Sequence, residues 1–133
     1  MRRVVVTGLG LVTPLACGVE ESWAAILAGR SGASRITKFK VDDLPTKIAC
    51  QVPWGDGADG SFNPDQWVDP KEQRRMDDFI IYGLAAAKQA VTDSGWDAKS
   101  EEDKQRTGPG EGTRGKQGGR NLLGYSISLA GAV

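Results

Sequence analysis

The chain has 133 residues, with 17 basic and 17 acidic side chains, no histidine and two cysteines. This length suits a single domain. The balanced charge gives no field that favours nucleic acid, and two cysteines do not make a disulfide framework. No apolar run approaches the roughly 18 residues that span a membrane, and Pro14 interrupts the start too early for a signal peptide. The simplest interpretation is a protein of the reducing cytoplasm.

A strand is predicted over residues 3–7, where three β-branched valines follow one another. Both faces are apolar, which favours burial in a parallel or covered sheet. Gly8 and Gly10 are then predicted to let the backbone turn tightly. A short amphipathic helix is predicted over residues 18–28, ended by Gly29. Its apolar residues fall on one face: Val19, Trp23, Ile26 and Leu27.

Residues 30–69 are predicted to be rich in loops, with one alternating strand over residues 46–52 that Pro53 closes. A long helix is predicted from about Pro70 to Ser94, with Asp69 as its N-cap and Gly95 after its end. Its apolar positions are so broadly spread that we expect burial on more than one side. These positions are Met76, Phe79, Ile80, Gly83, Leu84, Ala86, Ala87, Ala90 and Val91.

The composition changes abruptly after Gly108. Residues 109–120 contain no apolar side chain and cannot repay the entropy of ordering them. Residues 121–133 turn apolar again, with a weak alternation over residues 125–129. We therefore predict two parts: residues 1–108, and an atypical Gly-rich tail over residues 109–133 that is disordered or derived from a frameshift.

Two glycine motifs suggest phosphate binding, and both are incomplete. Gly8-x-Gly10 follows a strand, but Thr13 stands at the third glycine position of a dinucleotide fingerprint and Pro14 follows it. A buried strand and turn explain it better, and nucleotide binding is kept as an alternative. The stretch from Gly110 to Gln117 fits G-x-x-x-x-G-K but lacks the Ser or Thr that would reach Mg²⁺.

The cysteines do not form a reactive centre in this sequence. A nucleophilic cysteine needs a base, usually histidine, to hold it as thiolate, and the chain has none. Two cysteines without histidine also leave too few soft ligands for a metal. We expect Cys17 and Cys50 to be small buried hydrophobic residues, and predict no catalytic residue, no metal site and no cofactor.

One charged cluster stands out at the start of the long helix: Lys71, Arg74 and Arg75, followed by Asp77 and Asp78. Basic residues near a helix N-terminus oppose the helix dipole. Two interpretations stay open from the residues alone. The cluster is either a solvated face with local ion pairs or a small basic patch for an acidic partner.

Three segments carry a resemblance to a known family. They are RRVVVTGLGLVTPLACGVEESWAAILAGRSGASRITKF, the strand KIACQVP, and PKEQRRMDDFIIYGLAAAKQAVTDSGW. In order and spacing, residues 1–108 closely resemble the N-terminus of the type II 3-oxoacyl-acyl carrier protein synthases, the elongating condensing enzymes of bacterial fatty acid synthesis.

The resemblance implies a thiolase-like layered α/β fold, a homodimer and an acyltransferase that needs no organic redox cofactor. In that family an acyl group moves from carrier protein to a cysteine, malonyl-carrier protein loses CO₂, and the carbanion attacks the thioester. The nucleophilic cysteine and two histidines lie beyond Val133 in the family pattern, so none is carried over here. The family docks its acidic carrier protein on basic residues that match Lys71, Arg74 and Arg75.

The chain departs from the family after Arg106-Thr107-Gly108, where a central Gly-rich strand is expected and Pro109-Gly110 follows instead. We therefore expect an incomplete fold in which the buried face of helix 70–94 lacks its sheet. An inactive fragment of a condensing enzyme and a non-catalytic module that binds acyl carrier protein are the leading hypotheses. Oligomeric state and acyl chain length are left open.

Overall fold

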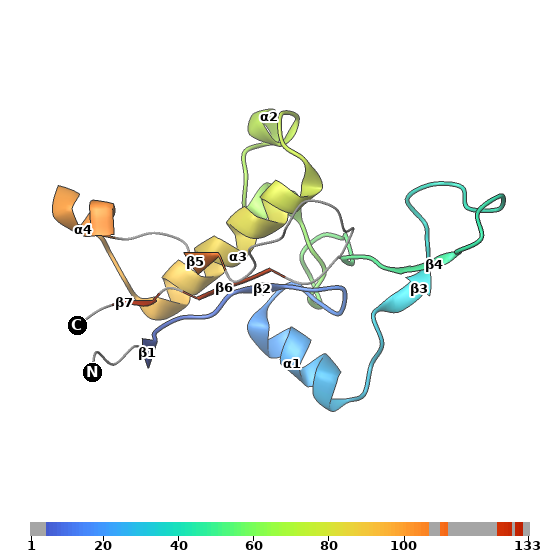
Figure 1. Ribbon diagram of the computed structural model, residues 1–133, viewed down its shortest axis with the longest axis horizontal. Coiled ribbons are helices and arrows are strands. Elements are labelled where there is room, and N and C mark those ends of the chain that lie inside the picture. Colours follow the sequence, from blue (N-terminus) through green and yellow to red (C-terminus); the bar gives the residue numbers. More distant parts are fainter. Residues whose placement is uncertain (1–4, 107–109, 112–124, 129, 132–133) are drawn as a thin grey trace.

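The computed structural model describes residues 5–106, 110–111, 125–128 and 130–131 (Figure 1). The strands are β1 (Val5–Val6), β2 (Leu11–Val12), β3 (Ala33–Arg35), β4 (Ile48–Cys50), β5 (Gly110–Glu111), β6 (Tyr125–Ser128) and β7 (Ala130–Gly131). The helices are α1 (Val19–Leu27), α2 (Pro70–Gln73), α3 (Asp78–Ser94) and α4 (Glu101–Arg106), with a 3₁₀ turn, η1, at Pro64–Gln66. This mixture confirms the predicted α/β class.

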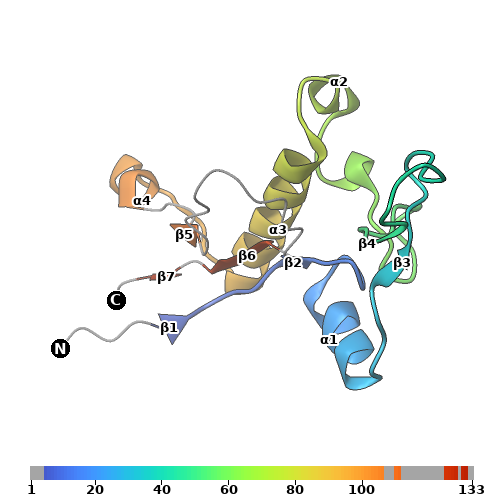
Figure 2. The same cartoon turned by 45° about the vertical axis from the view of Figure 1, so that its right-hand side comes forward.

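Each ladder between strands in the described part of the chain is antiparallel. β1 pairs with β7, β6 lies between β2 and β5, and β3 pairs with β4. Figures 1 and 2 show the β2–β6 pair running along one side of α3 in both views. α3 contacts both β2 and β6, so the prediction that this helix lacks a sheet partner is wrong.

β1 differs from the strand predicted over residues 3–7. It pairs antiparallel with β7, and Val5 and Val6 are 53% and 64% exposed. The prediction of a buried, parallel strand is therefore wrong for these two residues. Consecutive valines favour an extended backbone, but they do not specify what covers it. Residues 3 and 4 lie outside the described residues.

Gly8 and Gly10 bring the backbone against α3. A Cβ on Gly8 would lie 2.2 Å from the carbonyl oxygen of Ala90, and one on Gly10 would lie 2.0 Å from that of Ala86. Neither glycine has a positive φ. The prediction of a tight turn is wrong: glycine is needed here because any side chain would collide with the helix backbone.

Side chains of α3 also hold this segment by hydrogen bonds. The Leu9 N–H donates to Asp93 Oδ2 at 2.8 Å, and the Leu11 N–H donates to Gln89 Oε1 at 3.1 Å. These bonds satisfy backbone donors that would otherwise need a neighbouring strand. Side chains of α3 thus hold the segment that leads into β2, and Leu11 itself also pairs with Ser126 of β6.

α1 confirms the helix predicted over residues 18–28, and Gly29 follows it with a left-handed φ of 67°. Its buried residues are Ser22 and Ala25, not the larger apolar side chains that we expected to form its buried face. Those side chains are exposed: Trp23, Ile26 and Leu27.

The long helix predicted from Pro70 to Ser94 is two helices. Asp69 caps α2 as predicted, because its side chain accepts the Lys71 N–H at 2.8 Å. The backbone leaves helical geometry at Asp77, and α3 then runs to Ser94. Gly95 follows in the left-handed region, as predicted.

The break resolves the unfavourable charge order of a single helix. Arg74 and Arg75 follow the end of α2, where the helix dipole favours positive charge. Asp77 and Asp78 stand at the start of α3, where it favours negative charge. A single continuous helix would place the same basic residues near its N-terminus.

β4 confirms a strand within residues 46–52. Its partner β3 was missed by the interpretation of residues 30–69 as mainly loop, since Ala33–Arg35 is short and has no apolar alternation.

The main core lies between α3, β2 and the segment that contains β4 and η1. Its buried residues are Val12, Val52, Phe62, Val68, Ile81, Tyr82, Ala85 and Ala86.

α3 is buried on one side only. Ile81, Tyr82, Ala85, Ala86 and Ala90 are buried, so the expectation of burial on more than one side is wrong for this helix. The other large apolar residues are exposed: Phe79, Ile80, Leu84 and Val91.

No helix among the described residues combines the length and the apolar character needed to cross a bilayer.

Candidate functional site

The basic block lies on α2 and on the link that follows it. Lys71 is in the helix, Arg74 is its C-cap and Arg75 is the next residue, and all three are exposed. Figures 1 and 2 show that α2 projects from one end of α3, away from the strands, in both views. The structure therefore places the three predicted site residues together on one protruding surface.

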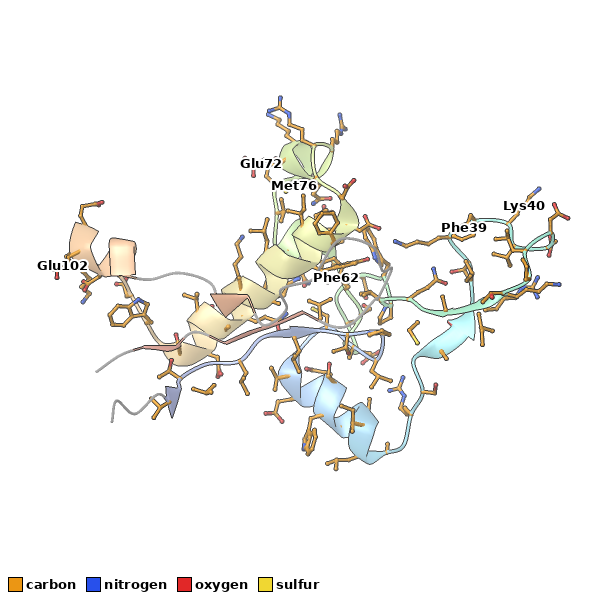
Figure 3. The ribbon with its side chains drawn as sticks, viewed as in Figure 1. Phe39, Lys40, Phe62, Glu72, Met76 and Glu102 are labelled. Carbon is orange, nitrogen blue, oxygen red and sulfur yellow. The ribbon has the colours of Figure 1, made fainter. Side chains whose placement is uncertain are left out.

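Two hydrogen bonds anchor this protrusion to the segment before it. Gln73 Nε2 donates to Asp65 Oδ1 at 2.9 Å and to the carbonyl oxygen of Val68 at 2.8 Å. Met76, which Figure 3 shows between α2 and α3, packs against the core cluster. α2 is only four residues long, too short to be stable alone, so these contacts fix the direction in which the basic residues point.

The three basic side chains make no ion pair within the described part of the chain. Salt bridges in this part of the chain join Arg35 to Asp42 and Lys38 to Asp78. The interpretation of the block as a solvated face with local ion pairs predicted such partners for Lys71, Arg74 or Arg75. Three exposed cations without partners remain available for an external anionic surface.

A second charged group is the ion pair between Lys38 and Asp78, and Asp78 begins α3 three residues after Arg75. Lys38 Nζ is 2.5 Å from Asp78 Oδ2 and 5.2 Å from the centre of the Trp54 ring. The hydrogen bond to Asp78 raises the pKa of Lys38 above its usual value. The sequence carried no signal for this pair, because 40 residues separate the two side chains.

Cys17 packs against the core but is half-buried, so its predicted burial is only partly confirmed. Burial raises the pKa of its thiol, although a hydrogen bond from Gln89 acts in the opposite direction. A raised pKa keeps the group protonated and weakly nucleophilic. Cys50 is exposed on β4, so its predicted burial is wrong; alternation along a short strand does not say which face is covered.

The glycine motifs gain no support as phosphate sites. Gly8 and Gly10 lie against the backbone of α3, and the chain continues into β2 rather than into a helix N-terminus. Most of the stretch from Gly110 to Gln117 lies outside the described residues. The described residues hold no group of three or more His, Cys, Asp or Glu side chains that could bind a metal.

Comparison with known proteins shows the family to which this chain belongs. The family model "Beta-ketoacyl synthase, N-terminal domain" matches residues 1–125. The chain belongs to the beta-ketoacyl synthase family. The match continues past Gly108, where the resemblance seen in the sequence stops.

Individual relatives of the chain belong to the same family. The chain is 54% identical over 120 residues to the 3-oxoacyl-[acyl-carrier-protein] synthase 2 of Rhizobium meliloti, covering 89% of this chain and 28% of that protein. It is 42% identical over 100 residues to the synthase of the same name from Vibrio cholerae, covering 75% and 22%. The chain thus spans about a quarter of the length of these beta-ketoacyl synthases.

A solved structure gives the same result. The ishigamide ketosynthase/chain length factor matches with a TM-score of 0.58 and 38% identity, over 77% of this chain and 23% of that one. This confirms the thiolase-like α/β fold expected from the sequence, for the N-terminal part that the beta-ketoacyl synthase match covers.

Proposed function

We propose that Lys71, Arg74 and Arg75 form a docking surface for acyl carrier protein, in a member of the 3-oxoacyl-acyl carrier protein synthases of fatty acid biosynthesis. The observation that carries this proposal is the exposure of three cations, on α2 and the link after it, that form no ion pair with the described residues. Acyl carrier protein is acidic, and complementary charge speeds and orients such encounters. The names of the relatives, which are synthases acting on acyl carrier protein, support this choice of partner.

The reaction of the complete enzyme, in this proposal, is decarboxylative condensation in the cytoplasm. Malonyl-carrier protein loses CO₂, and the carbanion displaces the thiolate of a cysteine-bound acyl group, which forms the new carbon–carbon bond. That chemistry needs a thiolate and donors for the oxyanion. The 133 residues contain no histidine, and the pKa of Cys17 is raised rather than lowered. We therefore propose that these 133 residues alone bind carrier protein without catalysing condensation.

Fluorescence anisotropy of a labelled bacterial acyl carrier protein tests the docking. The Lys71→Glu/Arg74→Glu variant reverses two charges of the block, and binding is expected to weaken by about tenfold or more. Lys40→Glu/Lys47→Glu is the matched control, since it changes the net charge equally at exposed sites outside the block. An equal loss in both variants, or no binding by the unchanged chain, would contradict the proposal.

A further inference from the structure

The basic block shares its stretch of chain with a larger number of acidic residues. Between Asp69 and Asp78 there are three basic and four acidic side chains. A surface that attracts an acidic protein must limit the repulsion from its own carboxylates. The two aspartates that follow Arg75 at the start of α3 are therefore the groups that need a counter-charge.

A lysine from a distant loop supplies that charge to Asp78. Lys38 lies between β3 and β4, and its ammonium group binds the Asp78 carboxylate at 2.5 Å. Both side chains are about half exposed, at 46% and 48%, so the pair lies at the surface. The two charges of the pair cancel at a point three residues along the chain from Arg75.

An aromatic cluster holds Lys38 at this position. The ammonium group stands over the Trp54 ring, where a cation is attracted to the π-face. Trp54 Nε1 donates to the Tyr82 hydroxyl at 2.6 Å. Tyr82 belongs to the first turns of α3, as does Asp78, so both contacts of Lys38 lead to the same helix.

The cluster is itself anchored in the core. Phe62 is fully buried, and its ring makes edge-to-face contacts with Tyr82 at 5.0 Å and with Trp54 at 5.8 Å between ring centres. Figure 3 shows Phe62 close to α3, while Lys40 extends from the loop between β3 and β4, far from α2. Two lysines two residues apart thus have different surroundings.

From this geometry we infer that Lys38 belongs to the docking surface, where it neutralises Asp78 and so keeps the face beside Arg74 and Arg75 attractive to an acidic carrier protein. The inference rests on the proposed docking function. Lys38 is a positioning residue in this role: it acts on the field through Asp78 and is not required to touch the partner.

A double-variant cycle with labelled bacterial acyl carrier protein tests this. Lys38→Met removes the counter-charge, and the dissociation constant is expected to rise by about two- to fivefold. Lys40→Met removes the same charge from the same loop and is expected to change it by less than twofold. In Lys38→Met/Asp78→Asn the unpaired carboxylate is gone as well, and the affinity is expected to return to within twofold of the unchanged chain.

Other outcomes overturn the inference. Equal effects of Lys38→Met and Lys40→Met would mean that Lys38 acts only through the net charge of the protein. A loss of affinity that persists in Lys38→Met/Asp78→Asn would mean that Lys38 touches the partner itself. Lys38→Arg keeps the charge and must bind normally, which separates charge from a folding defect seen by circular dichroism. If the unchanged chain binds carrier protein and Lys71→Glu/Arg74→Glu does not, the docking function stands and the Lys38 variants test only the role of Lys38. If the unchanged chain does not bind carrier protein, the docking function itself fails.

Discussion

Gly10 lies so close to Ala86 that a methyl group on Gly10 would stand 2.0 Å from the Ala86 carbonyl oxygen. That distance is shorter than any van der Waals contact, and the obstructing atom belongs to the helix backbone, which cannot move aside as a side chain can. The approach places the segment before β2 directly on α3, where it covers the part of the buried side around Ala86 and Ala90.

Replacing Gly10 by alanine is expected to destabilise the fold by about 3 kcal/mol, because the added methyl group forces the strand segment off the helix. Gly83→Ala is the control. Gly83 lies within α3 with nothing within 4 Å of the added Cβ, so alanine there should stabilise the helix by about 0.5–1 kcal/mol. Urea unfolding followed by circular dichroism measures both changes. Similar effects of the two substitutions would show that Gly10 is not in close contact with the helix.

Carrier-protein binding should weaken steeply with salt. Lys71, Arg74 and Arg75 are exposed and have no intramolecular ion pair in the described part of the chain, so added ions screen their attraction to an acidic partner. The affinity measured by anisotropy is expected to fall several-fold between low and physiological ionic strength, mainly through slower association. An affinity that does not depend on salt would indicate an apolar contact instead.

The two cysteines should differ in reactivity. Burial raises the pKa of Cys17 above its ordinary value of 9.0, while Cys50 is exposed. At pH 8 a thiol reagent is expected to modify Cys50 at least about tenfold faster, because the thiolate is the attacking species. Cys17→Ser and Cys50→Ser isolate each rate in turn. A fast reaction at Cys17 would contradict its half-buried position.

The same shift affects stability at high pH. A pKa raised by folding means that the folded chain holds the Cys17 proton more tightly than the unfolded chain. The stability from this protonated thiol is present below pH 9.0 and is lost as the pH rises towards the folded pKa. Urea titrations at pH 8 and pH 10 should show a smaller loss in Cys17→Ala than in the unchanged chain.

The exposed apolar side of α1 should bind a hydrophobic dye. Trp23, Ile26 and Leu27 are exposed, Leu27 by 70%, and contiguous exposed apolar side chains favour dye binding and association. Ile26→Lys/Leu27→Lys is expected to lower dye fluorescence and self-association while changing stability by less than about 0.5 kcal/mol. The new lysines lie at the helix C-terminus, where the dipole favours them. A large loss of stability would show that this side is covered.

Sequence reasoning located the ends of α1, the start of α2 and the end of α3, but it missed α4 and the break in the long helix. Gly29, Asp69 and Gly95 act within a few residues of the backbone that they cap, and all three behave as predicted. The break at Asp77 was missed because the apolar spacing continues through it. The basic-then-acidic order of Arg74, Arg75, Asp77 and Asp78 was the signal that could have revealed it.

Without any structure, the residues of the chain indicated the beta-ketoacyl synthase family and its α/β class through a resemblance of whole segments, and local order alone indicated the basic block at residues 71–75. Only the tertiary structure decided which side of α1 and α3 is buried, that Gly10 rests on Ala86, and that Lys38 reaches Asp78. Those features depend on which distant segments meet. Local preferences of backbone and side chains do not determine that, since packing sums many weak contacts between residues far apart in the chain.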